Sequence, residues 1–260
     1  MLYSGLCSVT FRKMTAVQIV ELAAKAGLAG IEWGGDVHVP HGQVEIARQV
    51  KDLTAAAGLE IPSYGSYYKV AESEKAGLAF AAVADSAAAL GAKTIRVWAG
   101  GKHSKDADAE YRKSVEDDSR RIASIAGQRG MTVSYEFHAG TLTDTAESAV
   151  ALLTAVDAAG LKTYWQPALK YTHNQRLKSL KAVRKWLTQV HVYYFTGEPA
   201  PEQAPLTRGQ AHWLEYLHAA AAAGGDRYCL LEFVPDSTAE SLLREAGTLN
   251  TWLKQINKED

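Results

Sequence analysis

Two sets of side chains in this 260-residue chain have the types and spacing to bind a metal ion or move a proton. The first lies in GIEWGGDVHVPHG, residues 30–42, which places Glu32, Asp36, His38 and His41 within ten positions. Zinc, manganese and cobalt sites use imidazole and carboxylate ligands. This stretch is therefore interpreted as a metal site, a catalytic loop or a polar turn, depending on which way the fold turns each side chain.

The second set consists of single polar residues in four β-rich runs, SYEFH, YWQP, VHVYYF and LLEFV. These residues are Glu136, Gln166, His191 and Glu232. A lone charge at such a position would be costly to bury, and two glutamates in one cavity repel each other unless a cation or a shared proton compensates. A divalent metal held by two carboxylates, an imidazole nitrogen and an amide oxygen meets that need. The alternative is that all four are core polar groups paired with other protein groups.

The elements that must position these residues follow from a repeated joint, in which a helical pattern ends at a glycine and a β-rich run begins. Helix stops with left-handed backbone are expected at Gly27, Gly58, Gly91, Gly130, Gly160 and Gly224. Capping patterns predict helix starts from Thr15, Asp144 and Ser237.

Eight strands are predicted to start near residues 3, 30, 60, 94, 132, 163, 189 and 228, each followed by a helical segment. The count predicts an α/β fold, a single (β/α)8 barrel over residues 1–260, with a doubly wound open sheet as the alternative. The active site of such a barrel lies at the carboxyl ends of the strands. The proline-rich stretch 196–209 is then a long loop at that end, typical of a lid or binding loop.

Composition limits the partners. The chain has 28 basic and 29 acidic side chains, so we expect neither nucleic acid nor an anionic membrane as a partner. Its two cysteines, Cys7 and Cys229, are far apart, which favours a reducing compartment. With no signal-peptide pattern and no apolar run of roughly 18 residues, a cytoplasmic protein is expected. Self-association into a homo-oligomer stays open.

The chain resembles the xylose isomerase-like barrels, a superfamily of sugar and sugar-phosphate isomerases and epimerases. The resemblance runs from GLCSVTF through GIEWGG, VSYEFH, YWQP and VHVYYF to LLEFV. It implies a divalent metal, Mn²⁺, Co²⁺, Mg²⁺ or Zn²⁺, bound by Glu136, His191 and Glu232. Gln166 stands where the family has an aspartate, which lowers the ligand charge. Leu169 replaces a frequent histidine, and Lys170 beside it offers a positive charge instead.

The function implied is a metal-dependent sugar or sugar-phosphate isomerase or epimerase. Such an enzyme removes a proton next to a carbonyl, the metal stabilises the enediolate, and Glu136 and Glu232 serve as base and acid on opposite faces. A dehydratase of a keto-polyol shares the first step and is an alternative. A sugar-binding barrel with a degraded metal site is another, and a DNA-repair nuclease is disfavoured by the charge balance.

The pocket walls are expected to be aromatic with a few polar anchors. The predicted substrate contacts are Trp33, His38, His41, Tyr67, Trp98, His138, Lys170 and Tyr193, and Tyr64 and Trp165 are further wall candidates. In the 30–42 stretch, His38 and His41 are expected to bond substrate hydroxyls or a phosphate, oriented by Glu32. Loop residues Lys102, His103 and Arg208 are candidates for contact with a phosphate.

Overall fold

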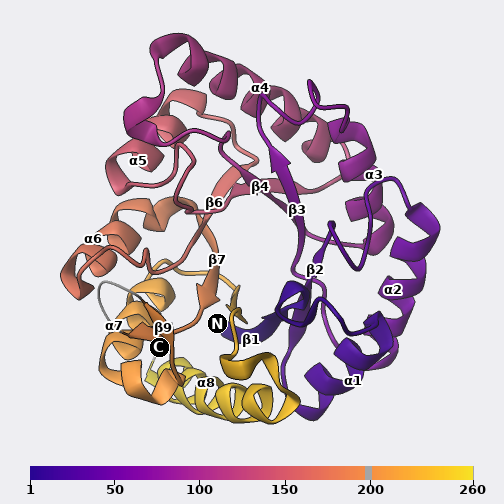
Figure 1. Cartoon of the computed structure of the whole chain (residues 1–260), viewed down its shortest axis with the longest axis vertical. Helices are drawn as coiled ribbons and strands as arrows, with labels where there is room; N and C mark the ends of the chain where they lie inside the picture. Colours follow the sequence, from indigo (N-terminus) through magenta and orange to yellow (C-terminus); the bar gives the residue numbers. More distant parts are fainter. Residues whose placement is uncertain (197–200, 260) are drawn as a thin grey trace.

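The computed structural model, which describes residues 1–196 and 201–259, is a closed barrel of eight parallel strands (Figure 1). Around the barrel the strands follow the chain, and the last pairs with the first. The strands are β1 (Leu2–Cys7), β2 (Gly30–Gly34), β3 (Ser63–Lys69), β4 (Thr94–Trp98), β5 (Thr132–Tyr135), β6 (Leu161–Trp165), β7 (Leu187–Val192) and β10 (Arg227–Leu231). The predicted (β/α)8 barrel is confirmed.

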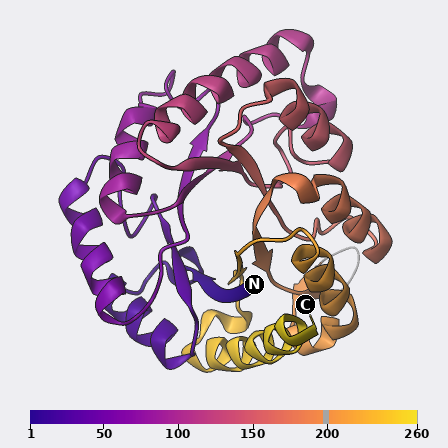
Figure 2. The same ribbon diagram turned by 180° about the vertical axis from the view of Figure 1, so that it is seen from behind.

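The described part of the chain contains eight α-helices, and the views from both ends show helices lying around the strands (Figures 1 and 2). They are α1 (Ala16–Lys25), α2 (Val44–Ala56), α3 (Phe80–Leu90), α4 (Ala109–Gly127), α5 (Ala146–Val156), α6 (His173–Val183), α7 (Gln210–Ala221) and α8 (Ala239–Glu259). Asn257 ties α8 to the start of β1, because its side chain accepts from the backbone N–H of Leu2 and donates to the carbonyl of Leu2.

The helix-to-strand joints bear out most of the expected glycine stops. Positive φ angles occur at Gly27, Gly58, Gly91, Gly130 and Gly224. The prediction for Gly160 is wrong, because α5 ends three residues earlier at Asp157, whose φ is 45°. Aspartate is one of the few other residues that tolerates the left-handed region.

The helix starts agree within one residue. Thr15 caps α1, and its side chain and that of Gln18 form the reciprocal capping box. The expected caps Asp144 and Ser237 are wrong by one position. Thr145 accepts from Ser148 N instead, and Thr238 accepts from Ser241 N. Thr145 and Thr238 have the extended backbone that an N-cap residue adopts, whereas Ser237 has a φ of 48°.

Short elements at the carboxyl ends of the strands shape the barrel mouth. They include η1 (Ser8–Phe11), η2 (Ser104–Asp106), η4 (Leu206–Gly209) and η5 (Pro235–Ser237), and η3 (Arg184–Trp186) precedes β7. The predicted lid loop forms a small antiparallel pair, β8 (Phe195–Thr196) with β9 (Glu202–Gln203), and its residues 197–200 lie outside the described part of the chain.

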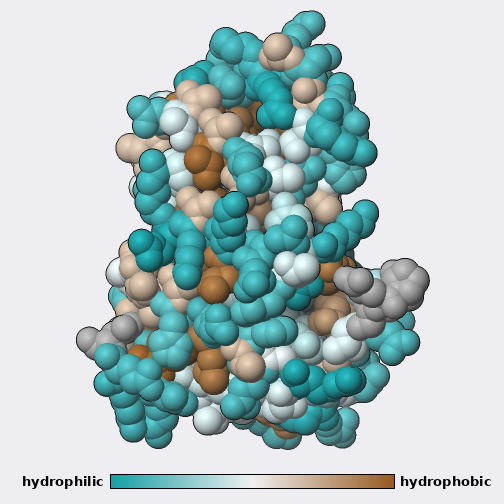
Figure 3. Space-filling model, turned by 90° about the vertical axis from the view of Figure 1, so that its left-hand side faces the viewer, coloured by the Kyte–Doolittle hydropathy of each residue, from teal (hydrophilic) through white to brown (hydrophobic). Residues whose placement is uncertain are grey.

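The outer surface is mostly polar. On the side seen in Figure 3, hydrophilic residues cover most of the face, and hydrophobic residues show as small separate areas. Over the described ranges, none of the helices has both the length and the apolar character needed to cross a membrane.

Candidate active site at the barrel mouth

A cavity of about 350 Å³ opens among the carboxyl ends of the strands. It is lined by Val9, Thr10, Arg12, Tyr67, Trp98, Glu136, His138, Gln166, Gln203, Glu232, Phe233 and Ser237. Three of the four predicted metal ligands are therefore on its wall. The volume is in the range of small-molecule sites.

The fourth predicted ligand, His191, lies beneath the other three. Its Nδ1 is 2.8 Å from Gln166 Oε1, 3.2 Å from Glu232 Oε2 and 3.7 Å from Glu136 Oε1. Ligand atoms of Glu136, His191 and Glu232 all lie within 4.8 Å of one another. The structure thus brings together the four residues that the sequence placed at adjacent strand ends.

The donor set fits a divalent cation. Glu232 Oε2 is buried and has no hydrogen-bond partner among the described residues. A buried carboxylate oxygen without a partner is costly, and a cation next to it removes that cost. Two carboxylates, one imidazole and one amide oxygen suit manganese, cobalt, magnesium or zinc.

The two glutamates differ in their surroundings. Glu136 Oε2 accepts hydrogen bonds from Arg96 Nη1 and, at 2.6 Å, from Trp98 Nε1. Burial opposes its charge, but the Arg96 guanidinium and neighbouring groups outweigh burial and hold the pKa of Glu136 below its ordinary value. Glu136 is therefore fixed as an anion, while Glu232 Oε2 makes no such hydrogen bond among the described residues and lies 3.2 Å from His191 Nδ1.

Arg96, in β4, is the main site residue that the sequence reasoning missed. Its side chain is 1% exposed and bridges Glu136 and Glu32, with Nε 3.0 Å from Glu32 Oε1. Its guanidinium also lies 4.7 Å from the centre of the Tyr67 ring. The signal was present, because Arg96 interrupts the β-rich run TIRVW as Glu136 interrupts SYEFH.

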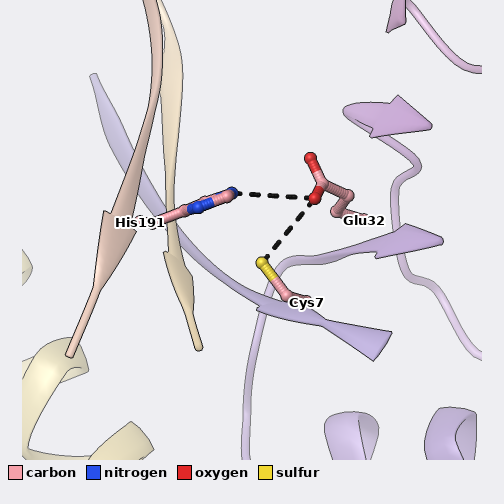
Figure 4. Close-up of side chains that lie close together, drawn as sticks. All are labelled: Cys7, Glu32 and His191. Atoms are coloured by element: carbon pink, nitrogen blue, oxygen red, sulfur yellow. Dashed lines mark hydrogen bonds and ion pairs between the residues drawn. The ribbon is translucent and has the colours of Figure 1, made fainter. Parts of the chain in front are cut away.

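Glu32 supports His191 from below. It accepts hydrogen bonds from Ser63 and Tyr164, each at 2.8 Å, and its Oε1 lies 3.6 Å from His191 Nε2. Figure 4 shows Glu32, Cys7 and His191 converging from three strands. Burial opposes the Glu32 charge, but Arg96 and its hydrogen bonds keep the pKa of Glu32 well below its ordinary value. A carboxylate facing one imidazole nitrogen orients the other toward the cavity.

Cys7, Glu32 and His191 also have atoms close enough to hold a metal, but Cys7 is poorly suited to it. Burial is the main cause that raises the pKa of the Cys7 thiol to about 12. Metals bind the thiolate, not the thiol. We therefore assign this lower cluster a supporting role.

Three of the predicted aromatic contacts line the cavity. Trp98 and His138 stack with ring centres 5.0 Å apart, and Tyr67 packs edge-on against Trp98. Tyr67 lies where the β3–β4 register shifts, and its φ is 55°. Left-handed backbone is strained for a tyrosine and is often found at functional sites.

A second, outer cavity of about 520 Å³ shares His138, Gln166 and Phe233 with the first. Lys170 and Tyr193, both predicted substrate contacts, line this outer cavity, as does His103. Lys102 instead lies over the Tyr111 ring, and neither it nor Arg208 lines either cavity.

Three predicted wall residues face the other way. Trp33, Tyr64 and Trp165 are fully buried, and their polar atoms donate to Thr54, the Val39 carbonyl and Ser179. Neighbouring residues of a strand point to opposite sides. Because Glu32 faces the barrel interior, Trp33 packs outward against α2 and does not meet the predicted role.

The histidines of the 30–42 stretch are also turned away from the cavity. His38 Nδ1 lies 3.0 Å from Ser8 Oγ, and its Nε2 lies 3.2 Å from the Met14 carbonyl. His41 Nε2 lies 2.8 Å from the Ser66 carbonyl. Both rings tie loops together, so the expected substrate wall is not formed by them, and Glu32 does not orient them.

A closed barrel with carboxylates, an imidazole and an amide gathered at the carboxyl ends of β5, β6, β7 and β10 has the donor set of a divalent-metal site. The family model described as "Xylose isomerase-like TIM barrel" matches residues 20–256, and the chain belongs to that family.

Sequence comparison finds a 3-dehydroshikimate dehydratase from Bacillus anthracis, 30% identical over 199 residues, which cover 72% of this chain and 70% of the relative. The crystal structure of the probable 3-DHS dehydratase AsbF from Bacillus anthracis has a TM-score of 0.80 and 24% identity, covering 96% of this chain and 99% of that one.

Two further solved structures share the fold. A xylose isomerase-like protein from Mycobacterium smegmatis in complex with magnesium has a TM-score of 0.76 and 16% identity, over 98% of this chain and 97% of that one. D-psicose 3-epimerase from Clostridium cellulolyticum H10 has a TM-score of 0.71 and 15% identity, over 98% and 99%. At these identities the likeness shows the fold alone.

Proposed function

We propose that the chain is a divalent-metal-dependent lyase that removes a proton next to a carbonyl and expels water, acting on a hydroxylated cyclic keto acid of the 3-dehydroshikimate type. The observation that carries this proposal is the unequal state of the two glutamates. Glu136 is held as an anion by hydrogen bonds from Arg96 and Trp98, whereas Glu232 Oε2 makes no hydrogen bond among the described residues and faces His191 Nδ1 at 3.2 Å. The site thus offers one carboxylate for proton transfer.

Glu136, Gln166, His191 and Glu232 are the residues that would hold the metal. When bound, the metal supplies Lewis-acid stabilisation of the enolate oxygen. Glu32 and Arg96 keep His191 and Glu136 in place from below. Gln166 brings an oxygen ligand without charge, which leaves the site with two carboxylates.

Glu232 takes the proton from the carbon next to the carbonyl. A second group must protonate the leaving hydroxyl, so that the products are an alkene and one water. His138 lines the same cavity, and its Nδ1 lies 2.5 Å from the Ala139 carbonyl, which fixes the ring against Trp98. We assign His138 this acid role, and solvent restores both protonation states after each turnover.

The similarity to a 3-dehydroshikimate dehydratase supports this choice of substrate type. Loss of water from 3-dehydroshikimate gives an aromatic dihydroxybenzoate, which provides a strong driving force. This step needs only one protein base to remove a proton from the substrate ring, and Glu232 is that base.

The test is turnover of 3-dehydroshikimate by Mn²⁺-loaded protein, followed by the ultraviolet absorbance of the aromatic product. We expect turnover that a chelator abolishes and added Mn²⁺ restores. Glu232→Gln should lower kcat by about 10²–10⁴-fold at saturating metal. Glu45→Gln, at an exposed position of α2, is the matched control. Equal rates for Glu232→Gln and the control would contradict the assignment.

A ketose 3-epimerase is the second candidate, because Glu136 and Glu232 line one cavity and could act on opposite faces of a substrate. Epimerisation in deuterated water incorporates deuterium at the reacting carbon without loss of water. Incorporation of solvent deuterium into ketoses, together with no turnover of 3-dehydroshikimate, would favour the epimerase over the lyase.

A further inference from the structure

The inner cavity that holds the metal-ligand cluster is also lined by two residues whose hydrogen-bond donors have no partner among the described residues. Thr10 in η1 and Gln203 in β9 both line the cavity. Thr10 Oγ1 and Gln203 Nε2 are buried and have no hydrogen-bond partner among the described residues. Buried donors of this kind are rare in folded proteins and call for a partner.

Arg12 adds a cation to the same wall. It forms an ion pair with Asp36, and its guanidinium lies 5.9 Å from the centre of the Tyr67 ring. The side chain is 49% exposed. A guanidinium has five N–H donors, so these two contacts leave donors for a ligand. The hydrogen bond to Asp36 is the first cause that raises the pKa of Arg12, so it stays charged.

Asp36 thereby acquires a role that the sequence motif did not reveal. It belongs to the dense polar stretch 30–42, yet it lies outside the metal-ligand cluster. Its ion pair fixes Arg12 above Tyr67. Asp36 is a positioning residue, and Arg12 is the group that meets the ligand.

We propose that Thr10, Arg12 and Gln203 form a subsite for an anionic substituent of the substrate, a carboxylate or a phosphate, held in the inner cavity beside the metal-ligand cluster. The three residues supply a hydroxyl, a guanidinium and an amide N–H₂, which together suit an oxyanion. Because both unpaired atoms are buried, ligand binding at this subsite requires the Thr10 and Gln203 side chains to rotate toward the cavity that they line. The choice of carboxylate as the first probe rests on the proposed function.

The test is calorimetric binding to the full chain loaded with Mn²⁺. The probes are 3,4-dihydroxybenzoate and catechol, which differ by the carboxylate alone. We expect the acid to bind wild type at least about tenfold more tightly than catechol, as charge-assisted hydrogen bonds would provide. Arg12→Met should remove most of that preference, Thr10→Val and Gln203→Glu should reduce it, and catechol affinity should not change.

Controls separate the subsite from general damage. Arg48→Met, at an exposed position of α2, and Thr248→Val, at a half-buried position of α8, change the same residue types outside the cavity and should leave the preference intact. Arg12→Lys keeps the charge and should keep part of the preference. Circular dichroism confirms that each variant is folded before binding is measured.

Whether the subsite takes a phosphate is tested by comparing the binding affinities of ribulose 5-phosphate and ribulose in the same calorimetric experiment. A preference for the phosphorylated member that Arg12→Met removes supports the subsite and assigns it to phosphate. No preference in either pair, or a preference that Arg12→Met leaves unchanged, would overturn the subsite. Because binding needs no turnover, a discriminating subsite in a protein that fails to dehydrate 3-dehydroshikimate would refute the proposed function alone.

Discussion

Arg96→Met should destabilise the barrel more than any surface change, because Arg96 neutralises two carboxylates inside it. The guanidinium is 1% exposed, and its partners Glu32 and Glu136 have side chains 1% and 4% exposed. Removing one member of a buried ion pair costs about 3–5 kcal/mol. In a chain of this size that corresponds to a fall in Tm of roughly 6–20 °C.

The assay is urea unfolding of metal-free protein followed by far-ultraviolet circular dichroism. Glu32→Gln in the Arg96→Met background removes one of the stranded charges and should recover about 1–3 kcal/mol, the size expected of coupled neighbours. Arg48→Met, at an exposed ion pair on α2, should change the free energy of unfolding by less than about 0.5 kcal/mol. A loss below about 1 kcal/mol for Arg96→Met, or no recovery in the double variant, would refute this view of the network.

Three further predictions concern the site and its surroundings. His138→Gln should lower kcat by about 10²-fold or more while bound metal, measured by elemental analysis, is unchanged; loss of metal would mean that His138 acts as a ligand. Gln166→Asp adds a negative ligand and should tighten Mn²⁺ binding by about tenfold in a chelator competition; unchanged affinity would place Gln166 outside the coordination sphere. Burial, the largest cause, lowers the pKa of His38 and of His41, so the unfolded chain binds more protons and stability should fall as pH drops below about 6.5. His38→Gln/His41→Gln should flatten that slope in urea titrations, and an unchanged slope would refute the assignment.

The fold was predictable because its signals are local and repeated. A helix must end and a strand must begin at each joint. Gly27 and Gly91 mark such joints because they have positive φ angles, which glycine adopts more easily than other residues. The count of eight strands, each followed by a helical segment, then predicts a barrel. The prediction at Gly160 was wrong because α5 ends at Asp157, and an aspartate does not mark a helix end as specifically as a glycine does.

The ligand cluster was predictable for a different reason. A polar residue at the end of a buried strand has few stable explanations, and Glu136 and Glu232 occur in corresponding positions of their strands. Arg96 lies inside β4 rather than at its end, and its two carboxylate partners come from other strands, so no local pattern reveals its role.

Side-chain direction in and after β2 could not be read from the sequence. Glu32 and Trp33 are adjacent, and one residue of register decides which of them enters the barrel. The buried ion pair with Arg96, made by a strand 64 residues away, fixes that choice. His38 and His41 bond backbone carbonyls and a serine of other segments, contacts that no local pattern encodes.

The most direct test of the central claim is the mass of the product made from 3-dehydroshikimate by the Mn²⁺-loaded chain. We predict a product lighter by one water, formed by wild type and lost in Glu232→Gln. A product of unchanged mass that carries solvent deuterium, or no metal-dependent product at all, would contradict the proposed dehydration.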